Sequence, residues 1–319
     1  MEKQRNNMSR ISKNLVFGLI LVTSFVFSQN ANAFDPCKPE NYTPVAERYK
    51  SGLLFEVQKC GILPSYVFGT MHSDMVEILK ILPPVFEKIR QSKSVNFELK
   101  SDGNQLAEVM QVMYYDADSP TNLETVIGTE LYAKLKAIMD VEKPDIPEFS
   151  YRRMKPWAVA IIMQYPSDTY DGVYTDLRLE NYAKEREVEI FGLETPAEQL
   201  SIFTEMSDEN QIEFLRETIE NFSLTDEIND QLVYAYLAQD LGQMQELAKQ
   251  AMDSIESEEF KELFLNKMIY SRNKLMVERS AERLAGGATF IAVGALHLAG
   301  EKGILALLEE NGYYINVAE

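Results

Sequence analysis

Two short stretches decide the expected fold: residues 66–72 read YVFGTMH, and residues 290–297 read FIAVGALH. Each stretch is an apolar run followed by Gly-x-x-His, and His72 and His297 are the only 2 histidines among the 319 residues. A short apolar run that ends at glycine is typical of a buried strand followed by a tight turn. Each histidine is therefore predicted just past the carboxyl end of a strand, where open α/β sheets build their sites.

The remaining strands are expected near the two ends of the chain and around residue 190. A hairpin partner for the first stretch is predicted at residues 52–57, and further strands at residues 94–99, 188–194 and 313–317. Helical patterns occupy about residues 101–170 and 197–285. This order predicts one α/β domain over residues 34–319, with a central mixed sheet, two Gly-x-x-His strand-helix units and a largely helical insert or lid.

The first 33 residues are predicted to be a cleavable secretory signal peptide. Four basic residues precede an apolar stretch from Leu15 to Phe27, and a small-x-small cleavage site follows at Ala31-Asn32-Ala33. The apolar stretch is shorter than the roughly 20 residues that span a bilayer. We therefore expect an exported protein, periplasmic or secreted, that is not inserted in the membrane after cleavage. An uncleaved membrane anchor is the alternative.

Composition narrows the classes of partner. The net charge is −19 and no basic face is evident, which argues against nucleic-acid binding because phosphate contacts need such a face. The only 2 cysteines, Cys37 and Cys60, are most simply a disulfide in an exported protein. This disulfide would close a loop of 23 positions and add about 3 kcal/mol to the free energy of unfolding. A thiol nucleophile or metal ligand is the alternative for these cysteines.

Four polar residues stand at the ends of apolar runs: His72, Glu98, Glu194 and His297. Two imidazoles and one or two carboxylates suit a zinc, manganese or cobalt ion, whose bound water could attack a carbonyl with a spare carboxylate as general base. Their distant positions do not guarantee that they converge. The alternatives are hydrogen-bonded turn histidines and carboxylates that face water or cap a helix. Arg272 could stabilise an oxyanion, although its position in a long helical stretch favours a solvated charge.

The chain resembles the TraB/GumN family, which is related to the TIKI proteases. The resemblance rests on the two Gly-x-x-His stretches, on residues 95–98 (VNFE), 191–200 (FGLETPAEQL) and 293–304 (VGALHLAGEKGI), and on Arg272-Asn273. It implies a fold like that of the erythromycin esterase and ChaN proteins, and a manganese- or cobalt-dependent protease activity. The implied metal ligands are His72, His297 and Glu98, and Glu194 and Arg272 are further site residues.

The leading functional hypothesis is an exported metal-dependent hydrolase that cleaves peptide bonds of a peptide or protein substrate. Glu194 would serve as ligand or base, and Arg272 would orient substrate or stabilise negative charge. One alternative is a non-catalytic protein that binds a peptide or small ligand, in keeping with the pheromone-shutdown role associated with TraB. Another is a metal-independent esterase with histidine as general base. The sequence does not indicate the substrate, the metal or the oligomeric state.

Overall fold

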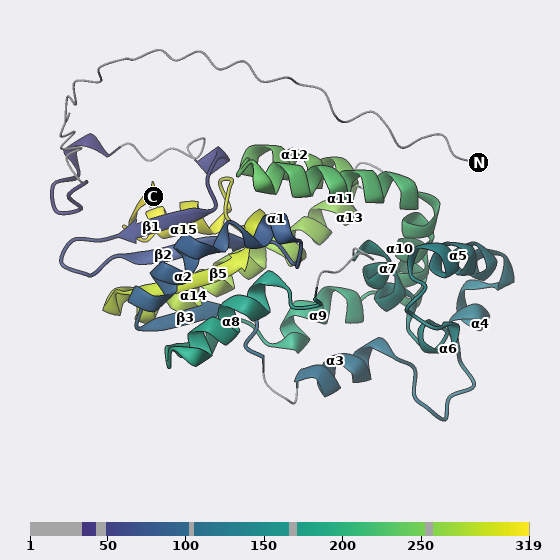
Figure 1. Ribbon diagram of the computed structural model, residues 1–319. Coiled ribbons are helices and arrows are strands. Elements are labelled where there is room, and N and C mark those ends of the chain that lie inside the picture. Colours follow the sequence, from purple (N-terminus) through teal and green to yellow (C-terminus); the bar gives the residue numbers. More distant parts are fainter. Residues whose placement is uncertain (1–33, 43–48, 102–104, 166–170, 253–257, 319) are drawn as a thin grey trace, which may run out of the picture. The chain divides into compact units, whose positions relative to one another are not determined.

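Six strands form one mixed sheet in the computed structural model, which describes residues 34–42, 49–101, 105–165, 171–252 and 258–318 (Figure 1). The predicted signal peptide lies outside these residues. The sheet has the order β4-β3-β5-β2-β1-β6. The strands are β1 Leu54–Gln58, β2 Ser65–Thr70, β3 Ser94–Phe97, β4 Glu189–Gly192, β5 Thr289–Gly294 and β6 Tyr314–Val317. Residues 35–319 cluster as one compact unit.

Four neighbouring strands of this sheet run parallel. Strand β5 lies between β3 and β2 and is parallel to both, and β4 is parallel to β3. Strand β1 pairs antiparallel with β2, which confirms the predicted hairpin, and β6 pairs antiparallel with β1. Strands β2, β3 and β5 are buried along almost their whole length, as expected where helices cover both faces of a parallel sheet. The carboxyl ends of β2, β3, β4 and β5 therefore meet at one edge.

Helices connect the strands. Strands β2 and β3 are joined by α1 Val76–Leu79 and α2 Leu82–Gln91, and β5 and β6 by α15 Ile304–Glu310. Between β3 and β4 lie α3 Gln105–Met113, α4 Leu123–Ile127, α5 Thr129–Glu142, α6 Glu148–Tyr151, α7 Pro156–Gln164 and α8 Thr175–Glu185. Between β4 and β5 lie α9 Pro196–Thr204, α10 Asp208–Glu220, α11 Phe222–Leu237, α12 Leu241–Met252, α13 Glu258–Leu265, the π-helical turn η3 Asn266–Tyr270 and α14 Ser271–Gly286. A short turn η4 Ala295–His297 follows β5.

Local sequence explains several of these boundaries. Pro83 and Pro84 lie in the first turn of α2, where a missing N–H costs nothing. Thr195 and Glu198 form a reciprocal capping box at the start of α9. The backbone of Gly287 ends α14 at a φ of +67°, which favours glycine.

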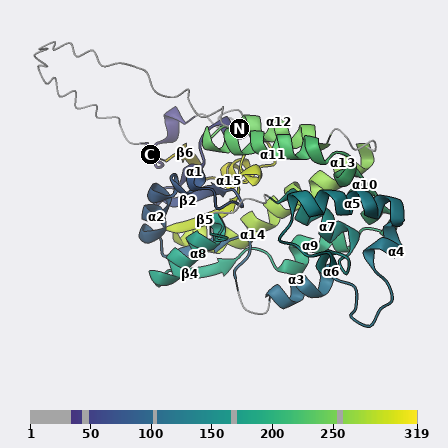
Figure 2. The same cartoon turned by 45° about the vertical axis from the view of Figure 1, so that its right-hand side comes forward.

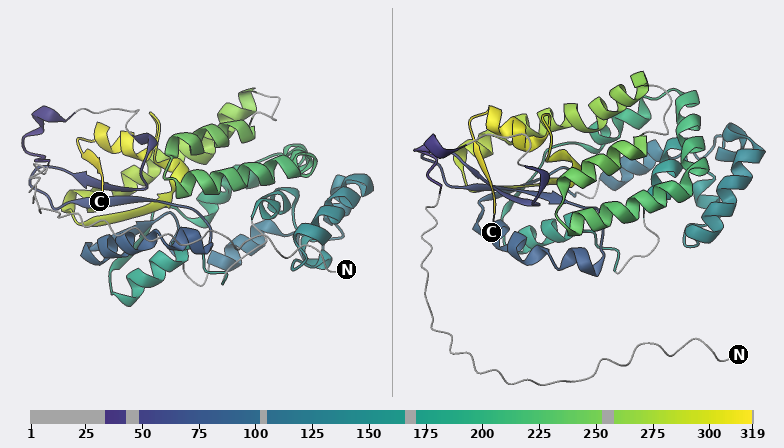
Figure 3. Two further views of the ribbon diagram at one scale, coloured as in Figure 1. Left: turned by 45° about the horizontal axis from the view of Figure 1, so that its top comes forward. Right: turned by 90° about the horizontal axis from the view of Figure 1, so that it is seen from above.

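The apolar side chains form two cores. One lies around the sheet and includes Phe55, Phe68 and Phe290. The other is largely helical and combines residues of α4–α7 with residues of α9 and α10, so both helical inserts contribute to it. Trp157 of α7 stacks on Phe203 of α9 with ring centroids 5.4 Å apart. Figure 2 shows α7 beside α10, and in Figures 2 and 3 the teal helices of residues 123–164 lie away from the strands.

Two further expectations concern export. Cys37 and Cys60 form a disulfide, with Cα atoms 4.7 Å apart, and such a bond is consistent with an exported protein. It ties the segment before β1 to the β1–β2 turn. Over the part of the chain that the structure describes, no helix has the length and apolarity needed to cross a bilayer.

Candidate functional site

The four polar residues singled out from the sequence follow the carboxyl ends of four adjacent parallel strands. His72 comes two residues after β2, Glu98 directly after β3, Glu194 two residues after β4, and His297 three residues after β5. Strands β2 and β5 are direct neighbours, with Thr70 paired to Gly294. The prediction that both histidines lie just past strand ends is confirmed.

The glycine of each Gly-x-x-His stretch leaves space for a close neighbour. A Cβ atom on Gly69 would lie 2.7 Å from Leu298 Cδ1 and 3.0 Å from the backbone of Ala295. A Cβ atom on Gly294 would lie 3.3 Å from Glu98 Oε1. The first glycine therefore allows the turn after β5 to pack on β2, and the second allows the Glu98 carboxylate to approach the end of β5.

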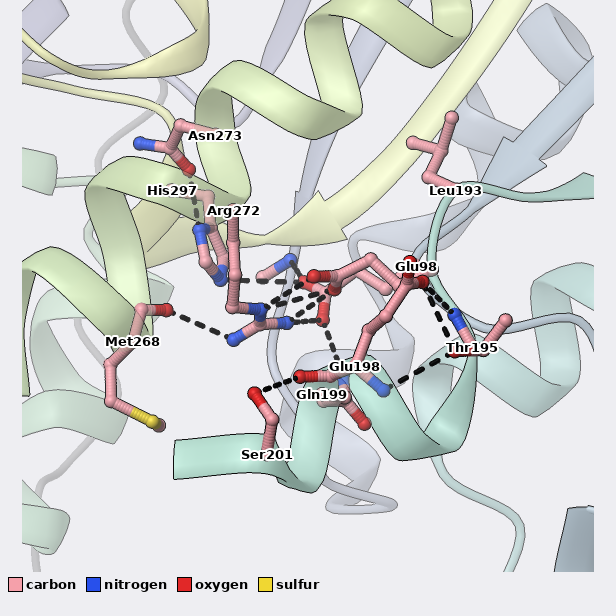
Figure 4. A network of polar contacts seen from close by, with 12 residues as sticks. Glu98, Leu193, Thr195, Glu198, Gln199, Ser201, Met268, Arg272, Asn273 and His297 are labelled. Carbon is pink, nitrogen blue, oxygen red and sulfur yellow. Dashed lines mark hydrogen bonds and ion pairs between the residues drawn. The ribbon is translucent and has the colours of Figure 1, made fainter. Parts of the chain in front are cut away.

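The Glu98 carboxylate is held from three sides (Figure 4). Its Oε1 accepts a hydrogen bond from the Gly294 backbone N–H at 2.6 Å. Its Oε2 accepts hydrogen bonds from Arg272 Nη2 at 2.9 Å and from Gln199 Nε2 at 3.1 Å. These donors fix the position of the carboxylate, and one lone pair of Oε1 has no donor among the residues that the structure describes.

Arg272, near the start of α14, joins Glu98 to Glu194. Its Nε and Nη2 atoms donate to the two oxygens of Glu194 at 2.9 and 2.7 Å, and its Nη1 donates to the Met268 carbonyl in η3 at 3.0 Å. The Arg272 side chain is 11% exposed and that of Glu194 is 0% exposed. The expectation that Arg272 is a solvated charge is therefore wrong, because α14 turns this side chain toward two strand-end carboxylates.

His297 is buried, and its tautomer can be assigned. Asn273 donates its Nδ2 to the Lys302 carbonyl at 2.8 Å, which turns Asn273 Oδ1 toward His297 Nδ1 at 2.6 Å. His297 Nδ1 must therefore carry the proton in this contact. Burial lowers the pKa of His297 to about 4, an effect that the Glu98 charge opposes and the Arg272 charge adds to. The imidazole is thus neutral at pH 7, with a lone pair on Nε2.

Two acceptors face each other as a result. His297 Nε2 lies 3.7 Å from Glu98 Oε1, too far for a hydrogen bond, and both atoms present lone pairs (Figure 4). We call these two atoms the acceptor pair. Two acceptors in a largely buried position are stable when a donor or a cation is placed beside them.

His72 stands in a more open environment. Its Nδ1 lies 3.1 Å from Asp176 Oδ2, and Asp176 Oδ1 accepts a hydrogen bond from Thr70 Oγ1 at 2.7 Å. The hydrogen bond to Asp176 raises the pKa of His72, burial opposes this, and the charges of Asp176 and Glu98 add to it. The side chain of His72 is 56% exposed. Its Nε2 has no hydrogen-bond partner among the residues that the structure describes, so it can meet a ligand or a proton.

Asp176 was not singled out from the sequence as a site residue. It belongs to the first turn of α8, whose start is tied to the residues after His72. Thr175 donates its backbone N–H and its Oγ1 to the Ser73 carbonyl, and Asp74 accepts from the backbone N–H groups of Asp171 and Gly172. These bonds bring Asp176 to His72 across 104 residues of sequence.

The donor set fits a divalent cation in its chemistry. Both histidines place Nδ1 against a side-chain oxygen and leave Nε2 available, an arrangement that is usual for metal-ligating histidine. The acceptor pair adds a carboxylate oxygen. However, no three His, Cys, Asp or Glu side chains among the described residues lie close enough together to hold one ion. His297 and Glu98 are adjacent, and His72 stands apart from them.

Comparison with known proteins agrees with the resemblance seen in the sequence. The model of the TraB/PrgY/gumN family matches residues 53–317, which include all of the strands described above. A comparison with curated proteins and one with solved structures gave no match.

Proposed function

Because the chain belongs to the TraB/PrgY/gumN family and places two histidines and Glu98 at one edge of its sheet, we propose that it is a metal-dependent hydrolase. Peptide bonds are the proposed target, in a substrate met outside the cytoplasm. The acceptor pair is the observation that carries this proposal. A neutral imidazole nitrogen and a carboxylate oxygen that face each other without a proton between them favour a cation there.

The proposed ligands are His297 and Glu98, whose acceptor atoms face each other. His72 stays a predicted third ligand, although no three such side chains among the described residues lie close enough together to hold one ion. A manganese, cobalt or zinc ion would supply an activated water for attack on a carbonyl. Gly294 and Arg272 hold the Glu98 carboxylate, so its free lone pair keeps one direction. Asn273 holds His297 in the tautomer that presents Nε2.

Glu194 and Arg272 fit a positioning role in this scheme. Both oxygens of Glu194 accept from Arg272, and the same guanidinium holds Glu98, so Glu194 orients Glu98 through Arg272. A base role for Glu194 would require it to leave this ion pair. The base role of Glu194 stays a prediction, and so does the stabilisation of negative charge by Arg272.

A second candidate function rests on the contact between His72 and Asp176. A histidine with Nδ1 on a carboxylate and an exposed Nε2 is suited to accept a proton from water and to pass it to the leaving group. In that case His72 acts as general base in a hydrolase that needs no metal.

Hydrolysis of a peptide library by the mature chain tests these candidates. The metal-dependent proposal expects cleavage that requires added Mn²⁺, Co²⁺ or Zn²⁺, stops with EDTA and is lost in His297→Ala. The surface variant Arg216→Met, whose side chain pairs only with nearby Glu213 in the structure, serves as control and is expected to retain activity. Cleavage that survives EDTA and depends on Asp176 would favour the second candidate. Peptide binding without cleavage in any metal would contradict both.

A further inference from the structure

Two tyrosine rings pack against His72 from different helices. Tyr174 immediately precedes α8, and its ring stacks on the His72 ring with centroids 4.8 Å apart and an interplanar angle of 28°. Tyr165 immediately follows α7, and its ring lies 6.0 Å from His72 at 65° and 6.4 Å from Tyr174. We call these three rings the aromatic corner.

The aromatic corner is accessible to a ligand. Tyr165 is 41% exposed, and the exposed His72 ring lies beside it. Neither tyrosine hydroxyl has a hydrogen-bond partner among the residues that the structure describes, so these phenols are not held by the fold. A tyrosine that only filled a core would bury its ring and bond its hydroxyl.

The carboxylates near the aromatic corner are already engaged. Asp176 accepts from Thr70 and contacts His72. Glu98 accepts from protein donors on both oxygens, and its one free lone pair points to His297. Among the residues that the structure describes, the carboxylates beside the corner are therefore already paired with protein groups. What it presents is ring surface and two hydroxyl groups.

We infer that the aromatic corner is a substrate subsite, which binds a neutral aromatic side chain close to the bond that is cleaved. The ring of that side chain would pack against Tyr165 and His72 in the offset or edge-to-face arrangements that aromatic pairs favour. This subsite rests on the proposed function, because that function identifies the ligand as part of a peptide substrate.

Binding of three blocked peptides tests this subsite without relying on hydrolysis. The peptides are acetyl-Ala-Ala-X-Ala-Ala-amide, in which X is phenylalanine, leucine or lysine, and their affinities for the mature chain are measured by NMR titration in EDTA. The phenylalanine peptide is expected to bind about fivefold more tightly than the other two, since an aromatic pair adds a modest gain beyond area burial. Tyr165→Leu should abolish this preference, and Tyr165→Phe should retain it.

A matched control is Tyr234→Leu, because Tyr234 is 72% exposed on α11 and forms no ring contact with His72. This variant is expected to keep the preference. Equal binding of the three peptides, preference for lysine, or no binding of the phenylalanine peptide at millimolar concentration would overturn the inference. So would a phenylalanine preference that survives in Tyr165→Leu. Because the readout is binding, a phenylalanine preference in a protein that cleaves nothing supports the subsite while contradicting the proposed hydrolase.

Discussion

Replacing Arg272 with methionine is predicted to destabilise the protein strongly. The substitution keeps a long side chain but removes the only guanidinium that the structure describes in contact with Glu98 and Glu194. Glu194 is fully buried and Glu98 is 19% exposed, so neither carboxylate can be fully hydrated instead. Removing one partner of a buried ion pair costs about 3–5 kcal/mol. We expect a loss of this size, and a fall in melting temperature of roughly 10 °C.

Urea unfolding followed by circular dichroism measures this loss in free energy. Arg216→Met is the matched control, since Arg216 pairs with Glu213 on the surface of α10 with 40% of its side chain exposed. An exposed pair of this kind contributes about 0.2–1 kcal/mol. The difference in free energy of unfolding between the two variants gives the contribution of the buried network, because the general effect of losing an arginine is common to both.

A second substitution tests the cause of the loss. Adding Glu194→Gln to Arg272→Met removes the unpaired buried charge, so the double variant should be more stable than Arg272→Met alone. Such a recovery is the coupling that a double-mutant cycle detects between partners. The described network does not hold the site together if Arg272→Met lowers the free energy of unfolding no more than Arg216→Met does. The same conclusion follows if Glu194→Gln lowers it as much in the Arg272→Met background as in the wild type.

Four further predictions follow from the structure. In NMR titrations the pKa of His72 should lie above its ordinary value and that of His297 near 4, and Asp176→Asn should lower only the former. The folded-state pKa of His297 is depressed, so below pH 6.5 the imidazole is protonated more readily in the unfolded chain than in the folded one. The contribution of His297 to the free energy of unfolding should therefore fall as the pH is lowered from about 6.5 to about 4. Asn273→Ala leaves the buried Nδ1–H of His297 without an acceptor and should cost about 2 kcal/mol in urea unfolding, an effect absent if water replaces the amide. Replacing both cysteines with serine should cost about 3 kcal/mol relative to the oxidised protein, and equal stability would show that the bond does not constrain the unfolded chain.

The strand-end residues could be predicted from the sequence because the signals are local. An apolar run, a glycine and a histidine within about eight positions place His72 and His297 past their strands, and an apolar run that ends at a carboxylate places Glu98. The parallel order of the strands then brings them to one edge. This part of the site depends on a pattern that each segment carries by itself.

The residues that orient this set come from helices and could not be located in the same way. Arg272 meets Glu98 across 174 residues of sequence, and Gln199 meets it across 101. Such contacts depend on how α14 and α9 approach the sheet, which side-chain packing in both cores decides. An arginine in a polar helical stretch gives no local sign that it will be buried, and the solvated interpretation of Arg272 failed for this reason. Asp176 gave no sign either, because an acidic residue in the first turn of a helix is common for electrostatic reasons alone.

Cobalt titration of the mature chain tests the central claim most directly. The visible absorption of Co²⁺ shifts and grows more intense when protein nitrogen and oxygen ligands replace its water ligands, so this change reports ligation rather than activity. The proposed site predicts saturation at one equivalent in the wild type and loss of the absorption in both His297→Ala and Glu98→Gln, while Arg216→Met behaves as wild type. A wild-type chain that gives no such absorption, or one whose absorption is unchanged in both site variants, would contradict the proposal that the acceptor pair holds a metal ion.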